Sequence, residues 1–227
     1  MGDRLDATGS GIPFRHRLYG LGSVYAKVFR DSRLAILGVA AFVGLTLLGG
    51  GSSMASAYGT PETRAQIADY ATRMPAAMRG MYGNPVNVGT VGGFLSWHYS
   101  GFFALATGLW SILALSSTLA GDLRRGSLEF VLAAPVSRRR VALEKLAAHV
   151  SAMTVAMLLV AACAWLTGVL WARMPGDAIP PGAALAFALK LGLMSLLAGA
   201  VAFALAPFLG SRSAAGLAGA HATAYAS

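Results

Sequence analysis

Residues Leu34–Gly50 have the sequence LAILGVAAFVGLTLLGG, an apolar run without a charged side chain. A run of this length suits a helix that crosses the hydrocarbon core of a membrane. Three more apolar runs of at least this length follow along the chain, and the two later ones contain only His149 and Lys190 as interruptions. We therefore expect an all-α polytopic membrane protein with four complete transmembrane helices, at about 34–51, 98–120, 146–172 and 183–209.

The composition agrees with this expectation. Hydrophobic residues make up 56% of the 227 residues and charged residues only 12%. Because a soluble domain carries roughly 25% charged residues, a disordered or purely soluble chain is excluded. The single cysteine, Cys163, lies inside an apolar run, so the sequence predicts neither a disulfide framework nor a cysteine metal site.

The C-terminal residues, 213–227, are small and weakly apolar. They follow Gly210-Ser211-Arg212, where we expect a break, so we interpret 213–227 as the start of an incomplete fifth span. The expected division is then a cytoplasmic N-terminus with an amphipathic elbow helix over 1–33 and a transmembrane domain over 34–227.

Basic residues are distributed unequally between the expected loops. Segments 1–33 and 121–145 carry six each and Arg212 adds one more, against four in total in the loops on the other side. The positive-inside rule places the richer side, and with it the N-terminus, in the cytoplasm. The net charge of +9 is therefore interpreted as the signature of a multi-pass cell (plasma) membrane protein, with no nucleic-acid partner.

The segments on the two sides of the first span each contain a helical pattern. Over Phe14–Arg33, apolar residues recur every three or four positions, which predicts an interfacial elbow helix, although an ordinary charged tail is the alternative. In the outer loop, 52–97, Thr60 can cap a helix that starts at Pro61 and stops at Pro75. We expect Ile67, Tyr70, Ala71 and Met74 to form its apolar face. This small helical extracytoplasmic cap would border a substrate exit or simply pack over the ends of the spans.

The inner loop, 121–145, carries the most specific pattern. Ser127 can cap a short helix, Glu129 suits its first turn, and Pro135 ends it, so we expect two helical turns over Leu128–Ala134. A short cytoplasmic helix held between two spans suits a lever that an external protein could move. A solvated basic loop is the alternative interpretation.

This inner-loop pattern resembles the coupling-helix region of type-2 ATP-binding-cassette (ABC) exporter permeases. There, Gly-Thr-Leu-Glu precedes a leucine-rich turn and a proline-hydroxyl-arginine sequence, and this chain has Gly126-Ser127-Leu128-Glu129 and Pro135-Val136-Ser137-Arg138. The outer loop resembles the polyketide-antibiotic exporter subgroup in Met81-Tyr82-Gly83-Asn84-Pro85 and in Thr90–Phe94 ahead of Trp97. The resemblance covers roughly Phe14 to Leu209.

The resemblance implies the permease subunit of an exporter for hydrophobic or amphipathic, antibiotic-like substrates, a role in antibiotic resistance. The residues that would form the coupling helix and dock on the ATPase are Arg124, Arg125, Gly126, Ser127, Leu128, Glu129, Phe130, Leu132 and Pro135. The implied partners are ABC ATPase subunits, a second permease half or copy, and membrane lipids. ATP and Mg would bind to the partner ATPase, and this chain would hold no cofactor. Because the family has six spans per half, we expect the remaining spans to come from a longer chain or from elsewhere.

Catalytic patterns do not appear in the sequence. No Gly-Lys-Ser/Thr occurs, so we expect no P-loop ATPase, and the four histidines are scattered without metal-ligand spacing. Lys190 lies inside a span, about seven residues or roughly 10 Å from its outer end, and is either a functional charge or a snorkelling lysine. His149 is expected in packing or a hydrogen bond. A non-transport polytopic membrane module that binds a partner or regulator remains the alternative function.

Overall fold

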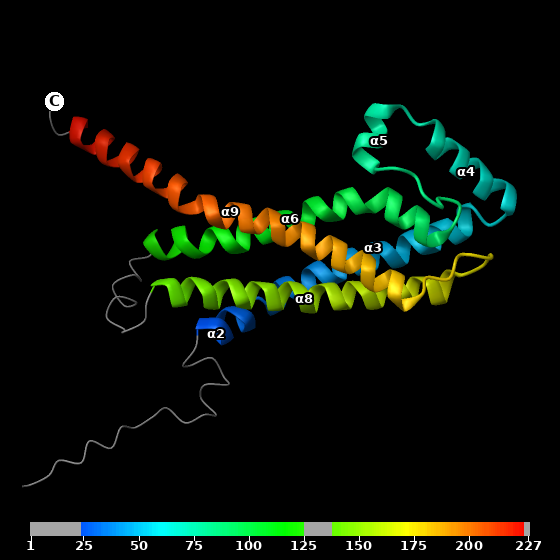
Figure 1. The fold of residues 1–227 in the computed structure, drawn as a ribbon, viewed down its shortest axis with the longest axis horizontal. Helices are drawn as coiled ribbons and strands as arrows, with labels where there is room; N and C mark the ends of the chain where they lie inside the picture. Colours follow the sequence, from blue (N-terminus) through cyan, green and yellow to red (C-terminus); the bar gives the residue numbers. More distant parts are fainter. Residues whose placement is uncertain (1–23, 125–137, 225–227) are drawn as a thin grey trace, which may run out of the picture.

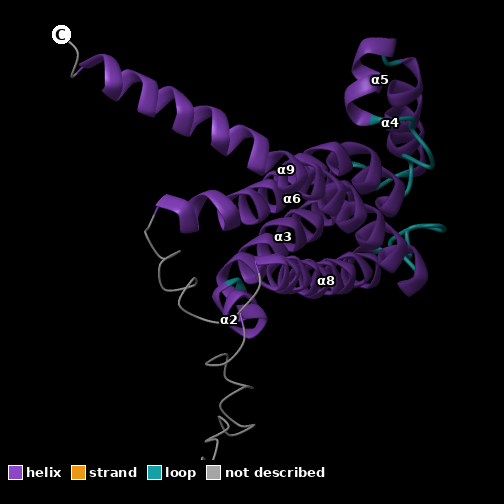
Figure 2. Ribbon diagram, turned by 60° about the vertical axis from the view of Figure 1, so that its left-hand side comes forward, coloured by secondary structure: helices purple, strands orange, loops and turns teal. Residues whose placement is uncertain are grey.

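The computed structural model describes residues 24–124 and 138–224, and within these ranges all regular structure is helical (Figures 1 and 2). The helices are α2 (Val24–Asp31), α3 (Arg33–Ala57), α4 (Pro61–Arg73), α5 (Ala76–Tyr82), α6 (Val91–Arg124), α8 (Arg138–Trp171) and α9 (Pro181–Ala224). The predicted all-α class is confirmed.

Helices α3, α6, α8 and α9 form an elongated bundle (Figure 1). Helix α6 packs mainly on α9, and α8 packs on both α3 and α9. We call one end of the bundle the α4 end; there α3 ends, α6 begins, α8 ends, α9 begins, and α4 and α5 lie nearby. At the opposite end, the α2 end, α3 begins, α6 ends, α8 begins, and α2 packs on α8.

Among the described residues, four helices are long and apolar enough to cross a membrane. Their qualifying stretches are Arg33–Ala57, Val91–Leu115, Arg139–Trp171 and Pro181–Leu205. The four predicted spans are thus present as helices, but several bounds differ from the prediction. Helix α6 ends at Arg124 instead of 120, α8 begins at Arg138 instead of 146, and α9 continues past 209 to Ala224. The first helix continues past 51 to Ala57, and the second begins at Val91 instead of 98, so the connecting segment is shorter than the predicted 52–97.

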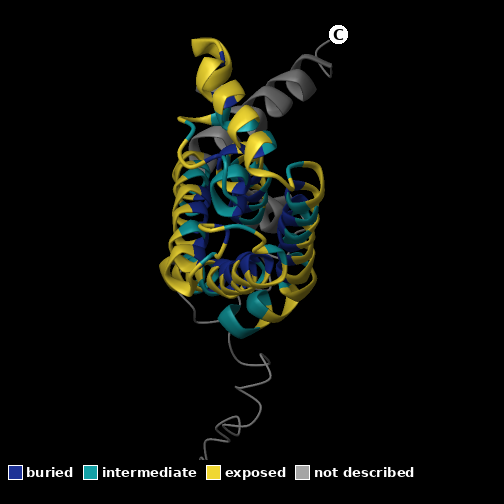
Figure 3. Cartoon of the chain, turned by 90° about the vertical axis from the view of Figure 1, so that its right-hand side faces the viewer, coloured by how far each residue is buried: buried dark blue, intermediate teal, exposed yellow. Residues whose placement is uncertain are grey.

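Burial in the bundle has the pattern expected when lipid surrounds it. Leucines such as Leu105 and Leu197 are exposed on the outer helix faces, whereas small and hydroxyl residues such as Ala152, Ala188 and Ser195 are buried between the helices (Figure 3). In water these leucines would form a large unstable apolar surface, but lipid tails solvate them as well as a protein core does. We therefore describe the chain as a membrane protein.

Glycines allow the helices to approach closely. A Cβ atom at Gly44 would lie 2.6 Å from the Cys163 Sγ atom. A Cβ atom at Gly199 would overlap the Ser111 hydroxyl, which brings α9 against α6. Small residues at helix crossings are the usual basis of helix packing in membranes, so these positions help to fix the bundle.

The predicted fifth span is wrong as a separate element. Helix α9 runs without interruption from Pro181 through Gly210-Ser211-Arg212 to Ala224. A single glycine costs a helix only about 1 kcal/mol relative to alanine, and the alanine-rich sequence that follows has high helix propensity. Residues 213–224 therefore extend α9 instead of starting a new helix.

The segments outside the spans agree only in part with their predictions. Helix α4 begins at Pro61 with Thr60 as its N-cap and ends before Pro75, as predicted, and Ala71 and Met74 are buried. Tyr70 does not belong to the packed face, because its side chain is 56% exposed. Of the predicted elbow helix, Val24–Asp31 is helical, and residues before 24 lie outside the described residues.

Candidate functional site

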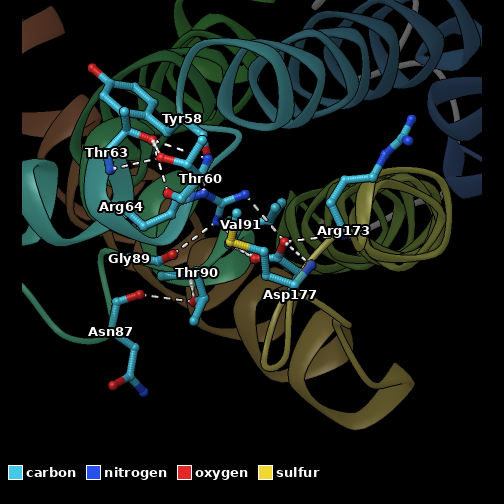
Figure 4. Close-up of polar contacts among 12 residues, drawn as sticks. Tyr58, Thr60, Thr63, Arg64, Asn87, Gly89, Thr90, Val91, Arg173 and Asp177 are labelled. Atoms are coloured by element: carbon cyan, nitrogen blue, oxygen red, sulfur yellow. Dashed lines mark hydrogen bonds and ion pairs between the residues drawn. The ribbon is translucent and has the colours of Figure 1, made fainter.

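A buried ion pair joins distant segments at the α4 end. Arg64 from α4 donates two hydrogen bonds to Asp177 in the α8–α9 loop, from Nη1 to Oδ1 at 2.8 Å and from Nη2 to Oδ2 at 3.2 Å (Figure 4). The side chains are only 5% and 1% exposed. Arg64 also donates to the carbonyl oxygens of Gly89, at 2.9 Å, and Tyr58. We call this group of contacts the clasp.

The Asp177 carboxylate also binds backbone N–H groups from two segments. Its Oδ1 atom accepts from Val91 N, at the first turn of α6, at 3.0 Å, and its Oδ2 atom accepts from Arg173 N and Met174 N at 3.2 and 3.0 Å (Figure 4). A carboxylate at a helix N-terminus satisfies a free N–H group and complements the helix dipole. The clasp therefore fixes the start of α6 relative to α4 and the end of α8.

The charge state of Asp177 follows from these contacts. Burial raises the pKa of the carboxyl, but the Arg64 guanidinium and the N–H groups of Val91, Arg173 and Met174 lower it, and the net pKa lies below its ordinary value. Asp177 is therefore ionised at neutral pH, and its negative charge compensates the positive charge of the buried Arg64.

Residues at the start of α6 favour the backbone geometry of the clasp. Thr90 caps α6, since its Oγ1 atom accepts a hydrogen bond from Gly93 N at 3.1 Å and donates one to Asn87 O at 2.9 Å. A Cβ atom at Gly93 would overlap the Asn87 carbonyl, so only glycine fits there. Sequence reasoning missed the clasp. The sequence contains Asp177 beside the short Pro175-Gly176 turn and Arg64 within α4, but no sequence pattern indicates that these two residues pair.

Aromatic rings collect at the same end of the bundle. Tyr82 lies 5.5 Å from Trp97, and His98 stacks on Phe94 at 5.3 Å, both measured between ring centroids. Such rings prefer the interface between membrane and water. The Trp97 side chain is buried within this aromatic group.

Two polar side-chain pairs lie within the bundle. Thr107 Oγ1 of α6 and Ser195 Oγ of α9 are 2.6 Å apart, and Ser111 Oγ of α6 and His149 Nε2 of α8 are 2.9 Å apart. All four side chains are buried. Of the two roles predicted for His149, packing or a hydrogen bond, the structure shows a hydrogen bond. The two pairs connect α6 to α8 and to α9.

Lys190 lines a cleft between α6 and α9 near the α4 end. The cleft has a volume of about 260 Å³, and its lining includes Ser96 and Ser100 of α6, Tyr82 of α5, and Met194 of α9. Lys190 is exposed and makes no ion pair with any residue that the structure describes. The predicted candidate charge is thus placed beside a cleft with hydroxyl groups.

At the α2 end, α2 is held on α8 by polar contacts. Tyr25 N donates to Glu144 Oε2 at 3.2 Å, and the Tyr25 hydroxyl donates to Ser151 Oγ at 3.0 Å. Glu144 also pairs with Arg140 at 2.9 Å. These groups are partly exposed, unlike those of the clasp.

The predicted coupling-helix residues lie almost wholly outside the described residues. Arg124 is the last residue of α6, and Arg125–Pro135 falls in the undescribed segment. Within the described part of the chain, no three histidine, cysteine, aspartate or glutamate side chains are grouped to hold a metal ion. Comparisons with family models, with curated proteins and with solved structures found no match.

Proposed function

We propose that the chain is the membrane-spanning permease subunit of an ATP-driven ABC exporter, which moves a hydrophobic or amphipathic, antibiotic-like substrate out of the cell. The observation that carries this proposal is the pair of long helices on either side of residues 125–137. Helices α6 and α8 have 34 residues each. At 1.5 Å per residue each measures about 50 Å, against about 30 Å for a hydrocarbon core.

The excess length gives residues 125–137 a mechanical role. A partner protein that held this segment would displace α6 and α8 directly, outside the hydrocarbon layer. Because α6 packs on α9 and α8 packs on α3, the displacement would reach all four long helices. The Gly126-Ser127-Leu128-Glu129 motif would then act as the coupling helix, and ATP and Mg would bind to the partner ATPase.

The charge distribution supports a cytoplasmic α2 end. The basic residues there include Lys27, Arg33 and Arg139, all exposed. At the α4 end, Arg64 pairs with Asp177 and Arg73 with Asp69, and Arg79 and Arg173 are exposed. Over the whole sequence, the loops on the side of the α2 end carry 13 basic residues against four on the other side. The positive-inside rule then favours a plasma-membrane protein with its N-terminus in the cytoplasm and α4 and α5 as an outer cap. The exposed apolar faces of the long helices would contact lipid and a second permease half or copy.

The proposal is tested by recovering the partner. The tagged chain is purified in detergent from its native membrane, and bound proteins are identified by mass spectrometry. We expect a P-loop ATPase with the wild type and its loss with Leu128→Asp and Glu129→Lys. Glu62→Lys, the same charge reversal at the α4 end, is the matched control and should retain the ATPase.

Membrane insertion of each variant is checked by extraction from sealed membranes, so that a folding defect is recognised. Recovery of no ATPase with the wild type would contradict the proposal. Equal recovery and equal ATP hydrolysis with all variants would remove the docking role of Leu128 and Glu129.

A further inference from the structure

The ammonium group of Lys190 lacks a counter-charge in its surroundings. Lys190 lies nine residues after Pro181, about 14 Å along α9, within a stretch that is otherwise apolar. The residues that line its cleft include no aspartate or glutamate. The two acids paired at the α4 end, Asp69 and Asp177, are bound to arginines. Lys190 itself makes no ion pair with a described residue, so its charge is open to an anion from outside them.

The hydroxyl groups of the cleft are also free to bind. The side-chain hydroxyls of Ser96 and Ser100 make no hydrogen bond with a described residue. Five other hydroxyls in the long helices bind the carbonyl oxygen four residues earlier, at 2.6 to 2.9 Å, and these are Thr46, Thr107, Thr154, Thr167 and Ser195. The hydroxyls of Ser52 and Ser53 on α3 resemble those of Ser96 and Ser100 in making no such bond. Two serines without such a bond, beside an unpaired lysine, form a cluster of donors that matches an anionic group.

The lining of the cleft combines polar and apolar side chains. On α6, Ser96 and Ser100 precede Ala104 from the α4 end, and on α9, Lys190 lies between the apolar lining residues Phe187 and Met194. Beyond the cleft, both helices expose leucines, which are Leu105, Leu109, Leu193 and Leu197. A ligand with an anionic headgroup and a hydrocarbon chain would match both the polar and the apolar side chains of the cleft.

We propose that this cleft is a binding site for an anionic phospholipid, with the phosphate on Lys190, Ser96 and Ser100 and an acyl chain along α6 and α9. A bilayer lipid is the occupant because the cleft lies beside leucines exposed on α6 and α9, and a phospholipid carries both an anionic phosphate and apolar acyl chains. Binding does not depend on transport activity or on an ATPase, so it can be tested independently of the proposed function.

The test measures lipid selectivity by native mass spectrometry. The full chain, delipidated in detergent, is titrated with phosphatidylglycerol or with phosphatidylcholine of the same acyl chains. We expect phosphatidylglycerol to bind about tenfold more tightly, because both lipids offer a phosphate but the trimethylammonium group of phosphatidylcholine offsets its charge and repels Lys190. Lys190→Gln should lower its affinity to that of phosphatidylcholine, and Lys190→Arg should keep the preference.

Two controls make the result specific. Lys27→Gln removes an exposed lysine from α2, at the opposite end, and should keep the lipid preference. The Ser96→Ala/Ser100→Ala double variant retains the charge and should weaken phosphatidylglycerol binding about threefold to tenfold, which provides a second reading if Lys190→Gln misfolds. Equal binding of the two lipids, full selectivity in Lys190→Gln and in the double variant, or displacement of phosphatidylglycerol by inorganic phosphate would each overturn the proposal.

Discussion

The two ends of the bundle are held together by contacts of different kinds. At the α4 end, the buried Arg64 and Asp177 join α4, the start of α6 and the α8–α9 loop through charged hydrogen bonds. At the α2 end, the ion pair between Arg140 and Glu144 lies within α8 and is partly exposed. Breaking a buried ion pair is far more costly than breaking an exposed one. We infer that the α4 end is the fixed point of the bundle and that the α2 end is the part a partner can displace.

The largest expected effect is the loss of the clasp. Asp177→Asn leaves the Arg64 guanidinium buried without a counter-charge, which should lower the free energy of unfolding by about 3–5 kcal/mol. Denaturant unfolding in detergent micelles, followed by circular dichroism, measures this loss. Asp69→Asn, the same substitution in the exposed Asp69–Arg73 pair, should cost no more than about 1 kcal/mol. Equal losses in the two variants would contradict a fixed α4 end.

Acid should weaken the same contact. Because the folded pKa of Asp177 lies below its ordinary value, the contribution of the clasp is complete above the unfolded pKa and is lost as the pH falls through the folded pKa. Between about pH 6 and pH 3 the wild type should therefore lose more stability than Asp177→Asn. Thermal unfolding across this pH range checks the difference, and parallel curves for the two proteins would count against an ionised Asp177.

The next largest effect is expected from steric overlap between α6 and α9. A methyl group at Gly199 would overlap Ser111, so Gly199→Ala should destabilise the bundle by about 1–3 kcal/mol. Gly38 has open space around its Cβ position, so Gly38→Ala should be neutral or stabilising by up to about 1 kcal/mol. Thermal unfolding of both variants separates steric overlap from helix propensity. A stabilised Gly199→Ala would show that α6 and α9 are not in close contact.

The hydroxyl pair between α6 and α9 should have a smaller effect. Thr107→Val removes the hydrogen bond to Ser195 and should cost about 0.6 kcal/mol, with an upper limit near 1.7 kcal/mol. Thr46→Val, in which the lost hydroxyl binds only the Phe42 carbonyl of its own helix, is the control. Denaturant unfolding under identical conditions compares them, and a larger loss in Thr46→Val would contradict a stabilising contact across the two helices.

The smallest effect is expected at the α2 end. Arg140→Gln breaks an exposed pair with Glu144 four residues later on the same helix, which is worth only about 0.3–0.5 kcal/mol. The variant should unfold within that margin of the wild type. A loss comparable to that of Asp177→Asn would show that both ends are fixed, and the contrast between them would be lost.

The sequence predicted the features that depend on neighbouring residues. The four long helices follow from apolar runs, and the start of α4 follows from Thr60 and Pro61. The start of α6 also has a local signal, because Thr90 caps it. Arg64 and Asp177, by contrast, are 113 residues apart, and no local pattern pairs two residues at that distance.

The cleft beside Lys190 also combines a residue that the sequence indicates with residues that it does not. Lys190 stands out in the sequence because a charge in an apolar run is unusual. Its neighbours Ser96 and Ser100 belong to another helix, and only the packing of α6 on α9 brings them to the same cleft. The break predicted at Gly210-Ser211-Arg212 was wrong because the alanine-rich sequence beyond it sustains the helix. Tertiary contacts were thus the part that sequence patterns could not supply, whereas the helix propensity of 213–224 was a local signal for the continuity of α9.

The most direct test of a cytoplasmic α2 end determines which end of the bundle an impermeant reagent reaches in intact cells. Single cysteines are introduced in a Cys163→Ala background, at Gln66 on α4 and at Arg139 at the start of α8, both exposed positions. Cells are treated with a membrane-impermeant maleimide before and after permeabilisation. We predict that the cysteine at 66 reacts in intact cells and that the cysteine at 139 reacts only after permeabilisation. The reverse pattern would place the α2 end outside the cell, where ATP-driven coupling through residues 125–137 could not operate.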